Sequence, residues 1–383
     1  MFNLEKFIYE KVICRPVSMF LPDLEERRDE ITRRVAGKRV LVIGGAGSIG
    51  SSFIRALMPY KPAALIVVDT NENALAELTR SLRSGGYSVP TDYIPYPMDY
   101  ASPIFERMFR ERGGFDIVAN FAAHKHVRSE KDMYSVAAMF RNNVLNARNL
   151  LALLGEYPPD CYFCVSTDKA ANPVNLMGAS KRLMEELIFA YAGTFPVKTA
   201  RFANVAFSNG SLPDGFMHRL SALEPLTAPT DVRRYFVSPE ESGQICLLSA
   251  VTANTGEILF PKLEEAQMMR FDRIAEDLLA AMGYNVLKCA SDEEAVEKAA
   301  ALRSGSRDYP VHFFTSDTSG EKSFEEFYTG TESLDLTRYK TLGAITGKVI
   351  DDRDPVLDFL ARLSDALEDP KTDKESLVAL IGG

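Results

Sequence analysis

The segment STDKAANPVNLMGASK holds the side chains with the clearest capacity for chemistry in this chain. It places an acid, Asp168, beside a base, Lys169, directly after an apolar run that predicts a buried strand. Lys181 follows Met177 by one helical turn. Because a thioether cannot release a proton, any proton chemistry here must come from Thr167, a water molecule or the Asp168–Lys169 pair.

A lysine acts as a base only after it has lost its proton, and a free lysine is protonated at neutral pH. Lys169 would therefore have to be partly buried or close to other cations. Asp168 opposes that change, because a carboxylate holds the charge on its neighbour, so we expect the two groups to titrate as a unit. The alternative is an ion pair at a strand end that does no chemistry.

A glycine-rich turn, VLVIGGAGSIG, stands between a predicted strand and a predicted helix. Glycine allows a tight turn there and lets backbone N–H groups approach a pyrophosphate at the positive end of the helix. We expect this turn to bind a dinucleotide through Gly44, Gly47, Ser48, Ile49 and Gly50. A glycine triplet alone could also be a simple loop.

Acidic residues follow the next two predicted strands in register with that turn. Asp69 comes nineteen residues after Gly50, where a carboxylate accepts hydrogen bonds from the adenosine ribose and repels a 2′-phosphate. This favours NAD over NADP. Asp99 is placed to meet the adenine amino group, with a solvated loop carboxylate as the alternative, and Ala122 is assigned to the same site.

Short apolar runs alternate with longer amphipathic ones from residue 38 onward. The expected strands cover 39–44, 64–69, 93–97, 116–121, 161–166 and 197–202, and the expected helices cover 48–58, 72–84, 103–111, 135–154 and 176–192. Elements that alternate at these lengths form right-handed βαβ units around a parallel sheet. The sequence predicts an α/β fold: a Rossmann-like doubly wound parallel sheet with a smaller C-terminal substrate-binding lobe.

The expected organisation has three parts. Residues 1–36 form an N-terminal helical arm, and residues 37–205 form the NAD-binding Rossmann domain. Residues 206–383 form the substrate-binding lobe and a C-terminal extension that interleaves with the Rossmann domain. Such sheets bind ligands at the carboxyl ends of their strands, so the lobe is expected to lie there.

Composition narrows the class of protein. The chain has 383 residues, 46% of them hydrophobic and 25% charged, as in ordinary globular proteins. Its net charge of −9 argues against broad binding to nucleic acid or anionic membranes. No apolar run approaches the roughly 18 residues that a membrane span needs, and the charged N-terminal stretch does not read as a signal peptide. We expect a cytoplasmic protein.

Cysteine usage agrees with a reducing compartment, since the five cysteines are sparse and odd in number. Cys161 and Cys164 have the spacing of a redox motif, but they fall in a predicted buried strand and are expected to be core residues. No His, Cys or acidic cluster has metal-ligand spacing, so no metal is expected.

Several motifs together resemble one known family. They are GGAGSIG, NFAAHKHV, the asparagine of FRNNV, the STDK segment, ARFANVAFSNGS and TSGEKSFEEF. With these the chain resembles the extended short-chain dehydrogenase/reductases and, among them, the bacterial polysaccharide-biosynthesis group of nucleotide-sugar 4,6-dehydratases, in a soluble form. The sequence departs from the group's pattern at Ile43, Phe202 and Ala203.

The resemblance implies a role for each residue of the first segment. Asp168 would donate a proton to the departing C6 oxygen of a hexose, and Lys169 would remove the C5 proton. Thr167 would hydrogen-bond the C4 oxygen, and Lys181 would contact the nicotinamide ribose. Met177 stands at the usual position of a catalytic tyrosine, as it does in related dehydratases.

Candidate substrate residues lie in three other places. Lys125 and His126 follow the fourth strand, although His126 could equally be structural. Asn204 is a candidate for gripping a pyrophosphate. Arg233 and Arg234 offer bidentate donors for phosphate or base, and either of them could instead be a surface cation.

Two polar residues near the site have weaker assignments. Glu130 is either a sugar contact or a solvated helix start. The resemblance implies that Asn143 braces the strand that carries the catalytic residues. In this superfamily the helices at 134–155 and 176–192 commonly pair with a second copy, so the resemblance implies a homo-oligomer, a dimer or larger.

Three functions remain open on the sequence. The first is an NAD-dependent 4,6-dehydratase acting on a nucleotide sugar, such as UDP-N-acetylglucosamine, for surface polysaccharide. The second is a nucleotide-sugar 4-epimerase, which normally uses the tyrosine that is missing here. The third is a catalytically silent NAD-binding scaffold protein.

Overall fold

The computed structural model describes residues 2–125, 130, 132–316 and 326–382. The chain divides into two compact units. The lobe unit consists of Met1–Met19, Ala203–Ser242 and Leu263–Glu325, and the sheet unit consists of Phe20–Phe202, Gly243–Lys262 and Glu326–Gly383. The two units interleave along the chain and do not follow the predicted ranges 1–36, 37–205 and 206–383.

The sheet unit is built on nine strands in the order β15-β16-β11-β6-β5-β4-β1-β2-β3. From β3 to β11 neighbouring strands are parallel, and β16 and β15 complete the sheet antiparallel. The strands are β1 (Arg39–Ile43), β2 (Ala64–Asp69), β3 (Asp92–Pro97), β4 (Ile117–Asn120), β5 (Cys161–Thr167), β6 (Val197–Phe202), β11 (Glu257–Pro261), β15 (Ser333–Asp335) and β16 (Leu342–Thr346).

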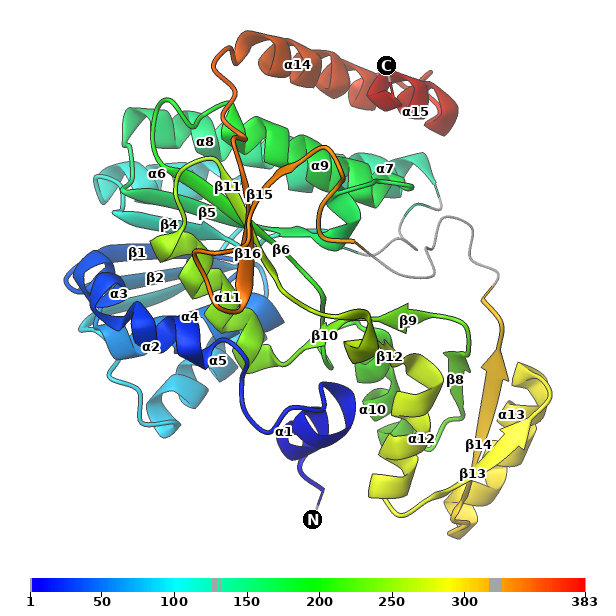
Figure 1. Ribbon diagram of the computed structural model, residues 1–383. Coiled ribbons are helices and arrows are strands. Elements are labelled where there is room, and N and C mark those ends of the chain that lie inside the picture. The colour runs from blue at the N-terminus through cyan, green and yellow to red at the C-terminus, as the bar shows by residue number, and fades with distance from the viewer. Residues whose placement is uncertain (1, 126–129, 131, 317–325, 383) are drawn as a thin grey trace. The chain divides into compact units, whose positions relative to one another are not determined.

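Helices cover both faces of this sheet: α4, α5 and α11 lie on one face and α6, α8 and α9 on the other (Figure 1). Their bounds are α2 (Leu21–Glu26), α3 (Arg28–Val35), α4 (Ser48–Leu57), η2 (Met58–Tyr60), α5 (Glu72–Ser84), α6 (Pro103–Glu111), α7 (Met133–Phe140), η4 (Arg141–Leu145), α8 (Asn146–Glu156), η5 (Asp168–Ala170), α9 (Leu176–Phe189) and α11 (Pro239–Thr252).

The predicted fold class is confirmed, and the first six strands lie where the sequence places them. The long helix expected over 135–154 contains a π-helical stretch, η4, between α7 and α8. Strands β11, β16 and β15 continue the main sheet, although the sequence assigned their residues to the lobe. Cys161 and Cys164 are buried in β5, as expected.

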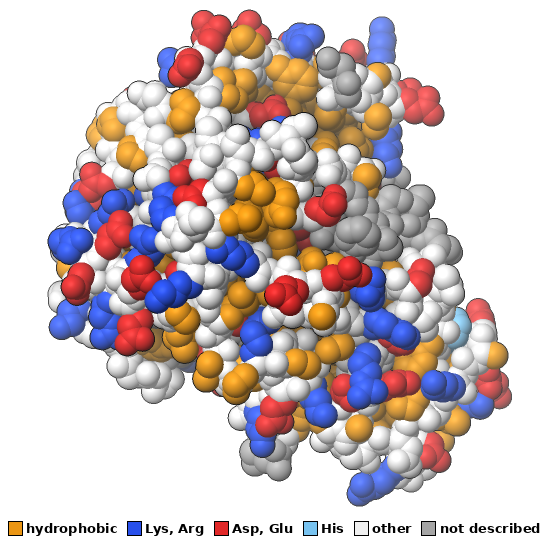
Figure 2. Space-filling view, in the orientation of Figure 1, with side chains coloured by type: hydrophobic (Ala, Val, Ile, Leu, Met, Phe, Trp, Pro, Cys, Tyr) orange, Lys and Arg blue, Asp and Glu red, His pale blue; other side chains and the backbone are white. Residues whose placement is uncertain are grey.

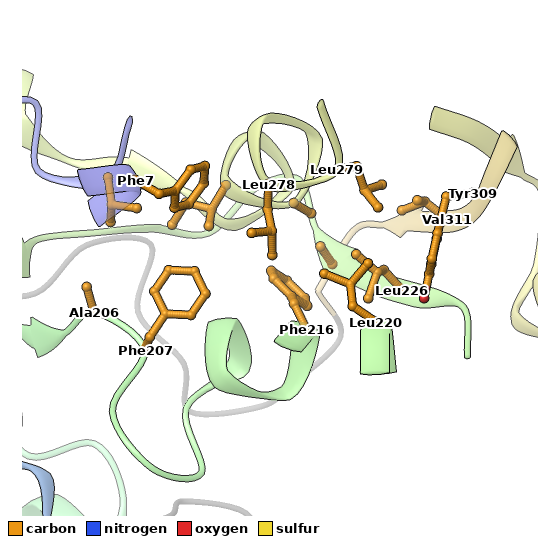
Figure 3. Close-up of a cluster of buried hydrophobic side chains, with 14 of the residues drawn as sticks. Phe7, Ala206, Phe207, Phe216, Leu220, Leu226, Leu278, Leu279, Tyr309 and Val311 are labelled. Carbon is orange, nitrogen blue, oxygen red and sulfur yellow. The ribbon is translucent and has the colours of Figure 1, made fainter. Parts of the chain in front are cut away.

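The lobe unit has its own apolar core (Figure 3). Phe7, Ile8 and Val12 of the N-terminal helices pack in it with Phe207 and Phe216. The N-terminal helices therefore contribute to the lobe core, because these three apolar side chains are buried there. The unit's elements are α1 (Leu4–Phe7), η1 (Ile8–Val12), β7 (Asn204–Val205), α10 (Leu212–Ala222), β8 (Leu226–Pro229), β9 (Arg233–Arg234), β10 (Phe236–Val237), η6 (Glu265–Gln267), β12 (Met269–Arg270), α12 (Phe271–Ala281), β13 (Asn285–Cys289), α13 (Asp292–Ala299), η7 (Ala300–Ser304) and β14 (Asp308–Phe314).

Two C-terminal helices, α14 (Asp354–Glu368) and α15 (Lys374–Gly382), complete the sheet unit. Helix α14 contacts α9 and η4, and Arg141 forms an ion pair with Glu368 at 3.0 Å. The chain's own C-terminal segment thus covers part of the helix pair that the resemblance assigns to a second copy. Oligomer formation stays a prediction.

The surface carries charges of both signs. Figure 2 shows basic and acidic side chains interspersed over the face in view, with apolar side chains between them. Within the described residues, no helix is both long enough and apolar enough to cross a membrane.

Candidate active site

The glycine turn between β1 and α4 is shaped by close backbone approaches. Gly44 has φ of +69°, and a Cβ there would lie 2.7 Å from the backbone nitrogen of Ala122. A Cβ on Gly50 would lie 2.3 Å from the carbonyl oxygen of Gly44. Gly47 is the N-cap of α4 and has no side chain that could bond the first N–H groups of the helix. The turn therefore presents backbone N–H groups at a helix N-terminus, which suits a phosphate.

A pocket of about 250 Å³ opens over this turn at the carboxyl ends of the strands. Asp69 and Asp99 both line it, as the sequence predicted. The carboxylate of Asp69 accepts the N–H groups of Ala46 at 3.0 Å and Asn71 at 2.9 Å, so it is held in place against the turn. The lining is Ile43, Gly44, Gly47, Val68, Asp69, Thr70, Met98, Asp99, Tyr100, Phe121, Ala122, Ala123, His124 and Asn142.

Sequence reasoning missed two supports of this pocket. The Oδ1 of Asn120 accepts the N–H of Ala122 at 3.0 Å and so fixes the backbone of Ala122, which lines the pocket. The Tyr100 hydroxyl donates to the carbonyl of Asn142 at 3.0 Å, and burial raises the pKa of this phenol. The sequence does contain a signal for Asn120, because it is the polar residue at the end of the apolar run that forms β4.

The predicted catalytic residues meet at the carboxyl end of β5. Three donors share the Oδ1 of Asp168: the Thr167 hydroxyl at 2.6 Å, the Lys169 backbone N–H at 2.9 Å and the Lys169 ammonium at 3.2 Å. Asp168 is 3% exposed, whereas the Lys169 side chain is 20% exposed. The arrangement is a buried carboxylate with an accessible ammonium in direct contact.

Helix α9 contacts the end of β5 through a lysine side chain. The Lys181 ammonium donates to the carbonyl of Val165 at 3.0 Å, and only 6% of the residue is exposed. Burial lowers the pKa of Lys181. Met177 lies on the same helix and is 3% exposed, so its thioether is part of the packed interior.

Asn143 bridges two segments near the end of the sheet, and none of the hydrogen bonds that its side chain makes with described residues goes to β5, the strand it was predicted to brace. Its Oδ1 accepts the N–H of His124 at 2.8 Å, and its Nδ2 donates to the carbonyl of His124 at 2.9 Å and to the Ser180 hydroxyl at 3.1 Å. The end of β4 and the start of α9 are thereby joined.

The residues after β4 are placed only in part. Lys125 is exposed, and His126 lies outside the described residues. Glu130 accepts the backbone N–H of Met177 at 2.7 Å, and its own carbonyl accepts the Lys374 ammonium at 2.9 Å. Glu130 therefore binds the first turn of α9 instead of standing free in solvent.

The remaining substrate candidates belong to the lobe unit. Asn204 has a buried Nδ2 with no hydrogen-bond partner among the described residues. Arg234 is buried and donates to the carbonyl of Arg233, whereas Arg233 is exposed and paired with Glu265 at 3.0 Å. Of the two arginines, Arg233 is thus the surface cation. In the part of the chain that the structure describes, no group of three or more His, Cys, Asp or Glu residues could hold a metal.

The parallel sheet, the glycine turn and the pocket-facing acids define a Rossmann-type nucleotide-binding protein. Residues 40–342 match the model of a family described as polysaccharide biosynthesis protein, and the chain belongs to that family.

The chain is also similar in sequence to two curated relatives. The chain is 27% identical over 307 residues to the capsular polysaccharide biosynthesis protein CapD of Staphylococcus aureus, covering 78% of this chain and 49% of the relative. It thus spans about half the length of that protein. It is 26% identical over 308 residues to the inverting UDP-N-acetylglucosamine 4,6-dehydratase of Campylobacter jejuni, covering 78% of this chain and 84% of the relative.

Among solved structures, the chain resembles DesIV, a dTDP-glucose 4,6-dehydratase from Streptomyces venezuelae solved with NAD bound. The TM-score is 0.58 at 21% identity, covering 76% of this chain and 88% of that one. This likeness supports the fold. The descriptions of these proteins concern polysaccharide biosynthesis and the dehydration of nucleotide sugars.

Proposed function

We propose that the protein is an NAD-dependent nucleotide-sugar 4,6-dehydratase, acting on UDP-N-acetylglucosamine or a related nucleotide hexosamine. The observation that carries the proposal is the shared Oδ1 of Asp168, which Lys169 and Thr167 both contact at the carboxyl end of β5, in the same sheet as the nucleotide-type pocket. The reaction needs an acid and a base within reach of neighbouring carbons of one ring.

The pocket residues fit NAD. A Cβ at Gly44 or Gly50 would fill the cradle against the backbone, so the turn is open only because these residues are glycines. Asp69 would bind the adenosine ribose, Asp99 the adenine, and the N–H groups at the start of α4 the pyrophosphate. Bound NAD would supply a hydride acceptor for C4 and a hydride donor for C6.

The Asp168–Lys169 pair can supply both proton steps without an outside proton. As an ion pair it holds one proton on the amine, and moving that proton across the 3.2 Å contact gives a neutral amine and a carboxylic acid. A substrate that excludes water favours the neutral form, because two charges are costly in a low dielectric. The amine of Lys169 then removes the C5 proton while Asp168 protonates the departing C6 oxygen, which restores the ion pair.

The proton balance closes around the ring. Protons leave the C4 hydroxyl and C5, and protons arrive at the departing C6 oxygen and again at C5. Thr167 would hydrogen-bond the C4 oxygen, since its hydroxyl already lies against Asp168. The C4 proton leaves to solvent, because Asp168 already carries the proton it took from Lys169. After the Lys169 ammonium has returned a proton to C5, one solvent proton restores the ion pair. Met177 takes no part because it is buried and has no acidic hydrogen.

The candidate substrate residues named from the sequence stay part of this proposal. The unpartnered Nδ2 of Asn204 is a donor suited to a phosphate oxygen, since a buried donor without a partner is costly. Arg234 is the stronger of the two arginine candidates. Lys125 and His126 stay candidate sugar contacts, and a cytoplasmic, homo-oligomeric protein stays the expectation from the sequence.

The proposal is tested by incubating the purified protein with UDP- and GDP-linked N-acetylglucosamine separately, with NAD in deuterated water, followed by mass spectrometry. A 4,6-dehydratase gives loss of one water and gain of one deuterium, because solvent protonates C5. Asp168→Asn and Lys169→Ala should abolish the product. Asp160→Asn, at the other end of the same strand, is a matched control that should retain it.

Two results would contradict the proposal. An isomer of unchanged mass without solvent deuterium would indicate a 4-epimerase. Binding of NAD without turnover of any nucleotide hexosamine would indicate the scaffold role.

A further inference from the structure

A buried ionic network in the sheet unit lies next to the catalytic strand end. At its centre is Arg201 of β6, which has no exposed surface. Its guanidinium binds Glu185 of α9 through two hydrogen bonds of 2.8 and 2.6 Å, and binds Glu332 through two more of 3.0 and 3.1 Å. The two bidentate contacts leave the guanidinium one orientation.

The network reaches the catalytic segment through one hydroxyl. Ser166, the residue before Thr167, donates to the Oε1 of Glu185 at 2.5 Å. One turn earlier on α9, Lys181 donates to the carbonyl of Val165 at 3.0 Å. Helix α9 therefore holds the two residues that directly precede the catalytic triplet, and Arg201 holds the carboxylate that makes one of those contacts.

The other end of the network anchors a distant part of the chain. Glu332 also accepts the Lys348 ammonium at 2.8 Å and the backbone N–H of Thr329 at 2.9 Å, and Arg201 donates to the carbonyl of Phe327 at 3.0 Å. The segment 327–332 is thus fixed to β6 by charged contacts inside the protein.

Such a network is a poor source of stability alone. Removing charges from water offsets most of their attraction, and apolar residues of similar size often serve as well. Its specific gain is geometry, because each contact here fixes a direction as well as a distance. That geometry is applied next to Asp168 and Lys169, where small displacements matter most to a reaction.

We infer that Glu332 and Arg201 are positioning residues for the reaction, acting through Glu185 and Ser166 on the alignment of Thr167, Asp168 and Lys169. The inference rests on the proposed function and adds residues that touch neither the nucleotide pocket lining nor the catalytic carboxylate. Without the chain of contacts, the triplet keeps its sequence but loses the fixed direction of its side chains.

The test is a double-mutant cycle of Ser166→Ala and Glu332→Gln. The kcat and KM of each variant are measured under conditions in which circular dichroism shows that every variant is folded. Each single change should lower kcat about 10- to 100-fold, with KM and NAD affinity within about twofold of wild type. The double variant should be no slower than the worse single variant, because both changes interrupt one chain of contacts.

Two control variants separate alignment from loss of packing or charge. Ser249→Ala removes a buried serine hydroxyl that bonds the carbonyl of Ile245 within α11. Lys348→Met removes a different partner of Glu332 and leaves both contacts of Arg201 in place. Both should keep wild-type kcat.

Hydrogen exchange supplies a readout that does not need turnover. Glu332→Gln should increase amide exchange in 166–170 and leave 40–50 unchanged. Unchanged kcat in Ser166→Ala, unchanged exchange of 166–170 in Glu332→Gln, or single effects on kcat that multiply in the double variant, would overturn the inference. An inactive wild-type protein would instead overturn the proposed function, and this inference with it.

Discussion

The buried Lys181 ammonium lies 3.0 Å from the carbonyl oxygen of Val165, a residue that precedes Thr167 by two positions. This contact fixes helix α9 to the backbone of strand β5. It also keeps a cation in a buried position, and burial lowers its pKa below the usual 10.5.

The buried ammonium predicts a pH dependence of stability. Because the folded-state pKa of Lys181 is lowered, the charged form destabilises the fold at neutral pH. That cost disappears as the pH rises through the folded pKa toward 10.5. The variant Lys181→Met has no such group, so the free energy of unfolding of wild type minus that of the variant should increase from neutral pH toward 10.5. Urea titrations across this range measure it, and a difference that is flat or falls would contradict the buried cation.

The packed thioether predicts that Met177 can be replaced without loss of chemistry. Met177→Leu conserves volume and should keep activity within about threefold, at a stability cost below about 1.5 kcal/mol. Thr167→Val removes the hydroxyl beside Asp168 and should lower kcat about 100-fold or more. Steady-state kinetics of the two variants distinguish these roles. Inactivation by Met177→Leu would show that the thioether is needed.

Replacing a glycine by alanine should have opposite effects in the glycine turn and in helix α8. A Cβ at Gly50 would lie 2.3 Å from the carbonyl oxygen of Gly44. Because both atoms belong to or are attached directly to the backbone, neither can move aside without shifting the turn. Gly50→Ala should therefore destabilise the protein by roughly 1–3 kcal/mol and weaken NAD binding at least about 10-fold. Gly155 lies in α8 with nothing within 4 Å of its Cβ position. Gly155→Ala should stabilise by about 0.5–1 kcal/mol and leave binding unchanged. Thermal unfolding and calorimetric titration test both, and normal NAD affinity in Gly50→Ala would contradict the site.

The fixed carboxylate of Asp69 predicts the choice of cofactor. Asp69→Asn keeps the shape and removes the charge that would repel a 2′-phosphate, so the preference for NAD over NADP should fall by about 10-fold, which equals roughly 1.4 kcal/mol. Asp92→Asn, which alters the ion pair with Arg112, is a control with the same change of charge. Calorimetric titrations with both dinucleotides measure the ratio. An unchanged ratio in Asp69→Asn would remove Asp69 from cofactor selection.

The sequence predicted the first half of the fold well, for a physical reason. Strands such as β1 and β5 are buried on both faces and read as apolar runs, and each is followed by a glycine turn or helix cap at a regular interval. The later strands β11 and β16 also lie in this sheet, but they are separated from it in sequence by the lobe segments. Their pairing is non-local, so no local pattern could assign them to the sheet.

The site was predictable only where it depends on strand ends. Asp69, Asp99 and Asp168 stand at strand ends and could be predicted as site residues, whereas the network of Arg201, Glu185 and Glu332 joins three separate parts of the chain. Arg201 reads in the sequence as one polar residue of a strand, and nothing near it indicates two buried carboxylate partners. The same limit applies to Glu130, whose partner Met177 is distant in sequence.

The most direct test of the proposed reaction follows one hydrogen atom. UDP-N-acetylglucosamine carrying deuterium at C4 is incubated with the protein and NAD in ordinary water, and the product is examined by nuclear magnetic resonance. We predict a 4-keto-6-deoxy sugar with the deuterium at C6, because the hydride taken from C4 returns to the same molecule. Deuterium still on C4 of a 4-epimer, or of unreacted substrate, would contradict the account.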